Sequence, residues 1–173
     1  METWAAVDSL RVVREYADRP ITEPELHRIL NAARRAGSSR NKQRWDLLVV
    51  RDRARLRALT EVAPYGTHMA QAAAVIAIVT PDPRLPDASL AITWDSGRAA
   101  QNMVLTAWEL GIGSCPITVY EPDRLREILG YPPTHHAPFM LALGYPADPK
   151  VLEQPKRPGG RKELDEILHQ ETW

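Results

Sequence analysis

Residues 32–52, AARRAGSSRNKQRWDLLVVRD, join the most regular helical pattern of the chain to a short apolar run that is typical of a strand. A connection between a helix and a strand usually needs about two to six residues and no particular chemistry. Here the residues between Gly37 and Trp45 comprise two hydroxyls, two amides and three cations. This composition indicates a binding loop, although a polar turn in solvent would share it.

Positive charge is concentrated around this connector. From Arg34 to Arg57 there are nine Lys or Arg residues and two acids, although the formal net charge of the whole chain is zero. A neutral total provides no basic field for nucleic acid, so we expect no nucleic-acid partner. The local excess suggests a nearby anion, while a solvated charged face is the commoner origin of such a run.

The composition is that of a globular protein. The chain has 173 residues, of which 44% are hydrophobic and 25% charged, and residues 1–173 are expected to form one domain. The single cysteine, Cys115, excludes an intramolecular disulfide and fits a reducing compartment. We recognise no leader, and charge interrupts the apolar runs before about eighteen residues, so a cytoplasmic protein without membrane contact is expected.

Apolar periodicity and capping residues predict the order of helices and strands. Thr22, Pro24 and Glu25 form a capping-box pattern before a helix that extends to Gly37. Further helices are expected from Asp52, over 90–110, over 122–130 and over 161–170, and strands over 46–50, 72–80, 114–120 and 137–144. Helices that separate most strands favour an α+β (α/β layered) fold.

The helix expected from Leu90 to Leu110 has a broad apolar face. Gly97, Ala99 and Ala100 are small enough to permit the close approach of another helix. The face consists of Leu90, Trp94, Gly97, Gln101, Val104, Leu105 and Trp108. A face this wide belongs either to the core or to the contact with a second subunit.

Common catalytic signatures are missing from the sequence. We find no phosphate-binding loop with its lysine, no Gly-x-Gly-x-x-Gly after a strand and no Gly-x-Ser-x-Gly elbow. His135 and His136 have no acidic or cysteine companion, so no metal site is expected. Chemistry supplied by a bound cofactor is the remaining interpretation.

Several stretches, taken in order, resemble the nitroreductase family of FMN-dependent oxidoreductases over nearly the whole chain. They are LRVVREYADRPIT (10–22), AGSSRNKQRWDLLVVRD (36–52), APYGTHMAQAAAVIAIV (63–79), DSGRAAQNMVLTAWELGIGSCPI (95–117), LALGYP (141–146) and GRKELDEILHQETW (160–173). Their order and spacing carry the resemblance. It implies a central mixed sheet flanked by helices, a long helix that forms a homodimer, and FMN at the subunit interface.

The resemblance also implies which residues hold FMN. Arg11 and Arg14 match basic positions near the phosphate or ribityl and the pyrimidine edge, where a cation favours the reduced flavin. The Ser-rich turn would come from the partner subunit, and the strand after the long helix would offer a backbone N–H to flavin N5. The implied residues are Arg11, Val12, Arg14, Ser38, Ser39, Asn41, Pro116, Ile117, Thr118, Arg161 and Lys162, with Arg157 as a substitute for the last pair.

The chain departs from the family pattern at several positions. Val12 stands where the family commonly has Ser or Thr, and Arg44 replaces the proline of an Asn-x-Gln-Pro-Trp turn. Tyr65 and His68 occupy the region where other members place an amide and a lysine, so their role stays open. At 173 residues the chain has little room for helices inserted over the site, and an open pocket with broad substrate tolerance is expected.

The implied function is electron transfer from NADH or NADPH through FMN to a nitroaromatic, a quinone or a similar small acceptor. The cycle would be ping-pong, with no side chain as nucleophile or general acid. Two alternatives stay open: a protein that sequesters FMN without turnover, which the departures at Val12 and Arg44 would fit, and a family member that cleaves the flavin.

Arg40, Lys42 and Arg44 alternate along the connector. In an extended segment these three cations would point to one side, and Asn41 and Gln43 to the other. At the mouth of the flavin pocket the cations would attract an anionic partner such as the 2′-phosphate of NADPH. Otherwise they decorate a turn in solvent.

Overall fold

The computed structural model of the protein describes residues 2–85, 89–154 and 160–173. The α-helices are α1 (Thr3–Ser9), α2 (Glu23–Arg34), α3 (Arg53–Leu59), α4 (Ala91–Glu109) and α5 (Pro122–Leu129). The strands are β1 (Asp46–Val50), β2 (Ala74–Pro81), β3 (Gly113–Thr118), β4 (His135–His136) and β5 (Phe139–Gly144). Short 3₁₀ turns are η1 (Ser39–Asn41), η2 (Thr60–Val62), η3 (Thr67–Gln71), η4 (Pro149–Leu152) and η5 (Leu164–Glu166).

The sheet has the strand order β1–β2–β5–β3, and the short β4 pairs with the end of β2. These strand pairings are antiparallel. Within the described residues, the parallel pairing of the expected mixed sheet is limited to an isolated bridge between Val12 and Ser114. Strands β1 and β3 are the two edges of this order. The outer side of β3 accepts the Val13 N–H at the Ser114 carbonyl, at 2.9 Å, and the edge beyond that point is free.

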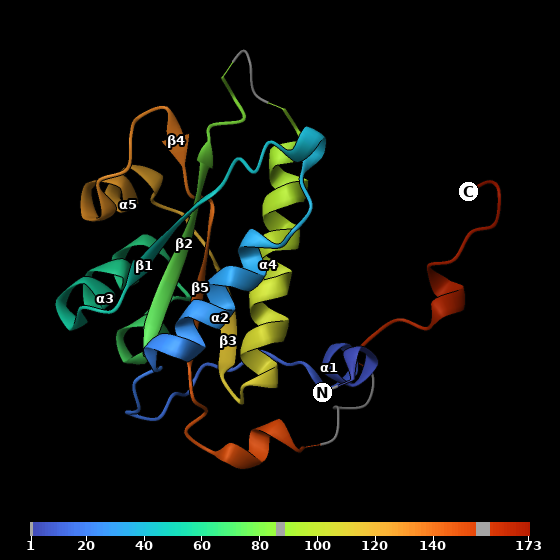
Figure 1. The fold of residues 1–173 in the computed structure, drawn as a ribbon, viewed down its shortest axis with the longest axis horizontal. Coiled ribbons are helices and arrows are strands. Elements are labelled where there is room, and N and C mark those ends of the chain that lie inside the picture. Colours follow the sequence, from blue (N-terminus) through green and yellow to red (C-terminus); the bar gives the residue numbers. More distant parts are fainter. Residues whose placement is uncertain (1, 86–88, 155–159) are drawn as a thin grey trace.

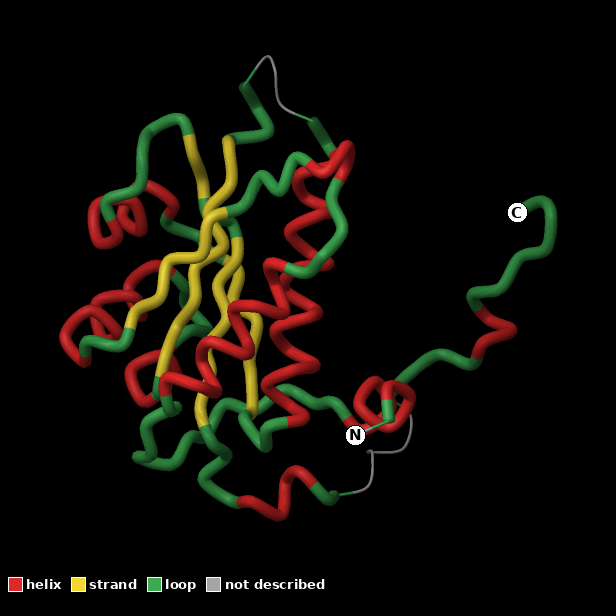
Figure 2. Tube along the Cα trace, viewed as in Figure 1, coloured by secondary structure: helices red, strands yellow, loops and turns green. Residues whose placement is uncertain are grey.

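Helices cover both faces of the sheet, which gives the body of the molecule three layers (Figures 1 and 2). Along β2, the even-numbered residues from Ala74 to Ile78 join the apolar cluster beneath α2 and α4. The odd-numbered residues from Val75 to Val79 join the cluster on the α3 and α5 side. Because side chains alternate along a strand, a strand covered on both faces is apolar throughout. The predicted α+β layered fold is confirmed.

Local signals place the helix starts where the sequence predicts them. The backbone N–H of Glu25 donates to Thr22 Oγ1 at 3.4 Å, and the N–H of Thr22 donates to the Glu25 carboxylate at 2.9 Å, which confirms the capping box. Asp52 Oδ1 accepts from the N–H of Arg55 at 2.9 Å and begins α3. The strand expected over 46–50 is also confirmed, but as an edge strand it is half-exposed rather than buried.

Two facing glycines let the N-terminal segment lie against the sheet. Gly113 and Gly144 are opposite each other in the β3–β5 pair. A Cβ atom on Gly113 would lie 2.5 Å from Val13 Cβ, and one on Gly144 would lie 2.7 Å from Tyr16 Cδ1. The missing side chains therefore make the space in which Val13 and Tyr16 are buried.

Helix α4 begins and ends within one residue of the predicted bounds. Val104 and Trp108 of its predicted apolar face are buried, whereas Leu90 is 88% and Trp94 is 73% exposed. The face is therefore divided between the core and an uncovered surface near the start of the helix. Like the other described helices, α4 is not long and apolar enough to cross a membrane.

The prediction of a helix over 161–170 is wrong. That segment contains the single 3₁₀ turn η5, and residues 160–173 are all exposed. Figure 1 shows this segment running away from the sheet. A short helix in water depends on packing of its apolar face, and here no such contact is made.

Candidate functional site

A cavity of about 260 Å³ opens beside the free edge of β3. Segments that are distant in the chain meet there, because the N-terminal segment contributes Arg14, the region of η3 contributes His68, and β3 contributes three predicted residues. Its lining is Arg14, Ala63, Tyr65, His68, Cys115, Pro116, Ile117, Thr118 and Tyr120. The fold thus brings together four of the predicted site residues, namely Arg14, Pro116, Ile117 and Thr118.

The pairing of β3 directs a backbone donor toward its free edge. In an antiparallel pair, alternate residues exchange backbone hydrogen bonds with the neighbouring strand. The N–H of Val119 donates to the Pro138 carbonyl at 3.0 Å, so the odd-numbered positions face β5. The N–H of Thr118 is therefore directed to the free edge, next to Pro116, which has no N–H to donate.

Arg14 supplies positive charge to this cavity. Its side chain is exposed, and no carboxylate in the described residues forms a salt bridge with it. Burial raises the pKa of the Cys115 thiol, and the nearby Arg14 guanidinium opposes that shift. The described residues contain no group of three or more His, Cys, Asp or Glu side chains that could hold a metal ion. The charge of Arg14 favours an anionic ligand in this cavity.

His68 contributes a buried ring nitrogen, Nε2, that has no hydrogen-bond partner in the described part of the chain. Buried polar atoms are nearly always paired, so this nitrogen, which solvent does not reach, is an exception in the wall of the cavity. Burial lowers the pKa of His68, and the charge of Arg14 lowers it further. The neutral form of the imidazole is therefore favoured at pH 7.

Replacing His68 with glutamine is expected to make the fold less sensitive to acid. The pKa of His68 in the fold lies below its usual 6.5, so the unfolded chain binds the proton more readily. Its contribution to stability is present above about pH 6.5 and is lost as the pH falls toward the lower folded pKa. When the pH is lowered from about 7.5 to 5.5, the melting temperature of His68→Gln should fall less than that of the wild type. The exposed His27→Gln on α2 controls for the loss of a histidine, and equal falls in all three proteins would contradict the prediction.

Arg11 and Val12 do not line the β3 cavity in the single chain. Arg11 Nη2 donates to the Gln154 carbonyl, and its Nε donates to the Ser9 carbonyl at 3.4 Å. Val12 is 47% exposed and forms the bridge to Ser114. Arg11 therefore ties the N-terminal segment to the chain after η4, and its contact with a phosphate stays a prediction.

The Ser-rich loop packs elsewhere, at the start of α4 (Figure 1). The N–H of Ser39 donates to the buried carboxylate of Asp95 at 2.8 Å, and the N–H of Gln43 donates to Ser38 Oγ at 2.9 Å. The three predicted loop residues, Ser38, Ser39 and Asn41, do not line the β3 cavity of their own chain. Their predicted contact with flavin therefore requires a second subunit.

The predicted C-terminal basic pair lies on the exposed segment after residue 160. Arg161 Nη1 donates to the Gly160 carbonyl at 3.1 Å, and Lys162 is exposed. Neither residue lines the β3 cavity. Arg157, the predicted substitute, lies outside the described residues.

The cavity also contains residues that the sequence left open or missed. Tyr65 and His68, whose role the sequence left open, both line it, as do the unpredicted Ala63, Cys115 and Tyr120. The polar stretch PYGTH (64–68) between the apolar patterns of α3 and β2 was the available signal. Its place beside β3 could not be deduced from local pattern.

The layered α+β fold thus has, beside its edge strand, a cavity in which Arg14 supplies one positive charge, and such a cavity suits a small anionic ligand. The family model described as "Nitroreductase family" matches residues 9–71 and 60–145. The chain therefore belongs to the nitroreductase family, as its sequence motifs predicted.

Similar proteins agree with this assignment. A relative from Archaeoglobus fulgidus is 36% identical over 169 residues, which cover 94% of each chain. An NAD(P)H FMN reductase of Bacillus subtilis is 28% identical over 182 residues, covering 94% of this chain and 71% of the relative. The structure of an FMN-dependent nitroreductase from Clostridium difficile matches with a TM-score of 0.83 at 23% identity, over 99% of this chain and 100% of that one. The structural match confirms a nitroreductase fold.

Proposed function

We propose that residues 1–173 form one FMN-binding domain of an oxidoreductase, which transfers electrons from NADH or NADPH to nitroaromatic, quinone or similar small acceptors in a ping-pong cycle. The observation that carries the proposal is the convergence of three groups in the β3 cavity. These are the Arg14 guanidinium, the neutral imidazole of His68 and the N–H of Thr118 at the strand edge. A cation, a neutral imidazole and a strand-edge donor fit the polar edge of a flavin.

Each of these groups has a distinct role in the proposal. When bound, FMN would supply hydride acceptance and electron donation. Arg14 would contact the pyrimidine edge, where its charge stabilises the negative charge of reduced flavin. The N–H of Thr118 would donate to flavin N5. Tyr65 lines the cavity but is 80% exposed, so it would not cover the flavin, and varied acceptors could enter.

The absorbance spectrum of the purified protein tests the proposed function. We expect a yellow protein, or FMN uptake with a Kd in the micromolar range or tighter, and bleaching by NADH or NADPH under nitrogen. Binding without bleaching would support sequestration of FMN, and breakdown of the isoalloxazine ring would support flavin cleavage. A protein that stays colourless after dialysis against FMN would overturn the proposal.

We also propose a homodimer in which α4 forms much of the subunit contact. The exposed Leu90 and Trp94 lie at the start of α4, and an apolar cavity of about 200 Å³ separates this helix from Phe139 on β5. Large exposed apolar side chains beside an apolar groove are typical of protein contacts. Such a contact would allow the loop 38–41 of one subunit to reach the flavin of the other.

Trp94→Glu is expected to dissociate this dimer, because a charge would be buried against apolar groups at the interface. Light scattering should give twice the 19.4 kDa chain mass for the wild type and a single chain mass for the variant. Trp4→Glu on α1, where Trp4 is 75% exposed, controls for adding charge at an exposed tryptophan. A stable wild-type monomer with FMN bound would contradict the shared site.

A further inference from the structure

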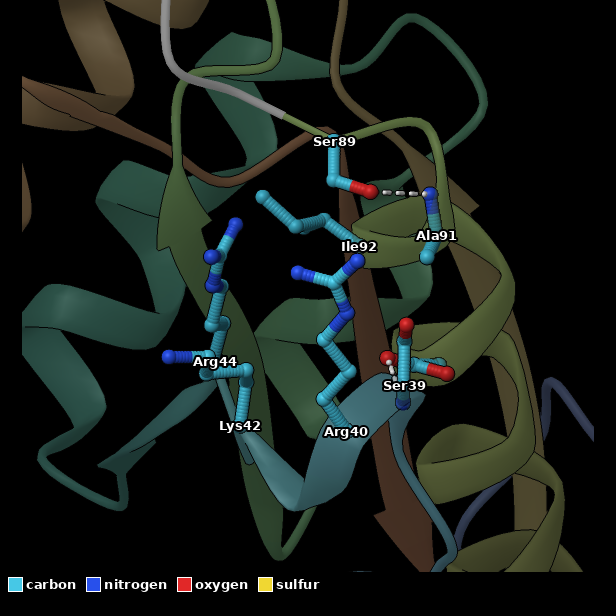
Figure 3. Close-up of a pocket in the computed structure, with 8 residues that line it drawn as sticks. Ser39, Arg40, Lys42, Arg44, Ser89, Ala91 and Ile92 are labelled. Atoms are coloured by element: carbon cyan, nitrogen blue, oxygen red, sulfur yellow. Dashed lines mark hydrogen bonds between the residues drawn. The ribbon is translucent and has the colours of Figure 1, made fainter.

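A second cavity, of about 240 Å³, lies between the Ser-rich loop and the start of α4 (Figure 3). It is separate from the β3 cavity of the same chain, and the proposed function gives no role to its three cations. Its lining is Ser39, Arg40, Lys42, Arg44, Ser89, Ala91, Ile92 and Asp95. Three cations from one short loop thus surround a space that contains a single carboxylate.

The backbone of this loop is folded rather than extended as predicted. Arg40, Asn41 and Gln43 have φ values of 52°, 55° and 49°, in the left-handed region. The bond from the Ser39 N–H to Asp95 and the bond from the Gln43 N–H to Ser38 hold the loop in this form. The cations still share one cavity, but the turn brings them there instead of strand alternation.

The three cations do not point in the same direction. Figure 3 shows the guanidinium groups of Arg40 and Arg44 extended toward the segment of Ser89 and Ile92. The Lys42 amine points to another side of the loop (Figure 3). The two arginines are therefore the pair placed to contact one ligand, and Lys42 adds to the positive potential around it.

These cations are not neutralised by the rest of the described chain. No salt bridge among its residues includes Arg40, Lys42 or Arg44, whereas other arginines such as Arg28 and Arg51 each pair with a glutamate. Asp95 is 6% exposed, and its Oδ2 already accepts the Ser39 N–H. Like charges around one cavity repel each other, so an anion bound between them would be stabilised.

We propose that Arg40 and Arg44 form a binding site for a phosphate monoester, and that the ligand is the 2′-phosphate of NADPH. Guanidinium groups bind phosphate oxygens through paired N–H donors, and two of them match the charge of a dianion. The choice of NADPH rests on the proposed function, because it is the reductant that carries this group. The site would then make the enzyme prefer NADPH over NADH.

Two adenosine ligands test the site without turnover. Adenosine 2′,5′-bisphosphate and AMP differ by the 2′-phosphate, and calorimetry of the FMN-loaded protein compares their affinities. We expect the bisphosphate to bind about tenfold more tightly at low salt, and added salt to reduce this ratio. Arg40→Gln/Arg44→Gln, which removes both guanidinium charges and keeps the side chains polar, should abolish most of the difference.

A matched control removes the same charge elsewhere. Arg55 and Arg57 on α3 are exposed and have no salt-bridge partner among residues 2–85, 89–154 and 160–173. Arg55→Gln/Arg57→Gln should therefore keep the preference for the bisphosphate. An equal loss in both double variants would show a general effect of net charge and overturn the proposal. Equal binding of both adenosine ligands by the wild type would also overturn it.

Kinetics and flavin binding separate this site from the proposed function. The ratio of kcat/KM for NADPH to that for NADH should fall in Lys42→Ala/Arg44→Ala, most clearly at low salt. If the arginine variant loses affinity for FMN but keeps the preference for the bisphosphate, the site belongs to the flavin phosphate and the proposal fails. If the proposed site is correct, protein without FMN should still bind adenosine 2′,5′-bisphosphate more tightly than AMP. A protein that binds no FMN but keeps this preference would contradict the proposed function and not the phosphate site.

Discussion

Replacement of Arg14 with alanine is expected to raise the Kd for FMN roughly 10- to 100-fold and to lower the reduction potential of the flavin. Arg14 lines the β3 cavity. Loss of a hydrogen bond to a charged group costs about 1.5–3 kcal/mol, which corresponds to this range of affinity. Reduced flavin carries negative charge at its pyrimidine edge, so it loses more stabilisation than oxidised flavin, and the potential falls. Fluorescence titration and spectroelectrochemistry measure the two effects.

Two variants control the Arg14 experiment. Arg14→Lys keeps the charge but not the paired donors, so it should restore more of the potential than of the affinity. Arg55→Ala removes an exposed arginine from α3, away from the cavity, and should change neither quantity. If Arg14→Ala left both the Kd and the potential unchanged, Arg14 would be a surface residue with no flavin contact.

Gly113→Ala is expected to destabilise the fold by about 1–3 kcal/mol through overpacking. The added Cβ atom would lie 2.5 Å from Val13 Cβ, which is close to the backbone and cannot rotate away. The N-terminal segment must therefore shift, and Arg14 would shift with it. A domain of this size loses about 2–4 °C in melting temperature per kcal/mol, so thermal unfolding reveals the change. The affinity for FMN should fall in the same variant.

The same methyl group placed on α4 provides the control for Gly113→Ala. No heavy atom lies within 4 Å of a Cβ built on Gly97, and alanine is the better helix former. Gly97→Ala should therefore keep or raise the melting temperature, with light scattering to follow the proposed dimer contact. A Gly113→Ala protein as stable as the wild type would show that Val13 and β3 adjust without cost.

Signals that act over a few residues could be interpreted correctly from the sequence. The capping box of Thr22 and Glu25 and the cap at Asp52 begin helices, because each satisfies a free backbone N–H of the first turn. The apolar run over 72–80 predicts a strand, and β2 is confirmed there. These predictions need no knowledge of distant parts of the chain.

Predictions that depended on a partner surface were less successful. The apolar positions over 161–170 have the spacing of a helix, but that segment makes only the turn η5. The broad face of α4 is similarly divided, with Trp108 buried and Trp94 exposed. The spacing of apolar residues indicates which side of a helix or strand is apolar, but it does not indicate which part of the protein covers that side.

The family, the order of most helices and strands and four of the nine residues that line the β3 cavity could be predicted from the sequence alone, because each rests on a local motif or on the order of motifs. Only the tertiary structure shows which of the predicted side chains lie together. Packing at Gly113 and Gly144 brings Arg14 to β3, and the chain before β2 adds His68, whereas Arg161 stays apart. The physical reason is that a site joins segments far apart in the chain, and strand pairing and side-chain volume set those contacts rather than any local preference.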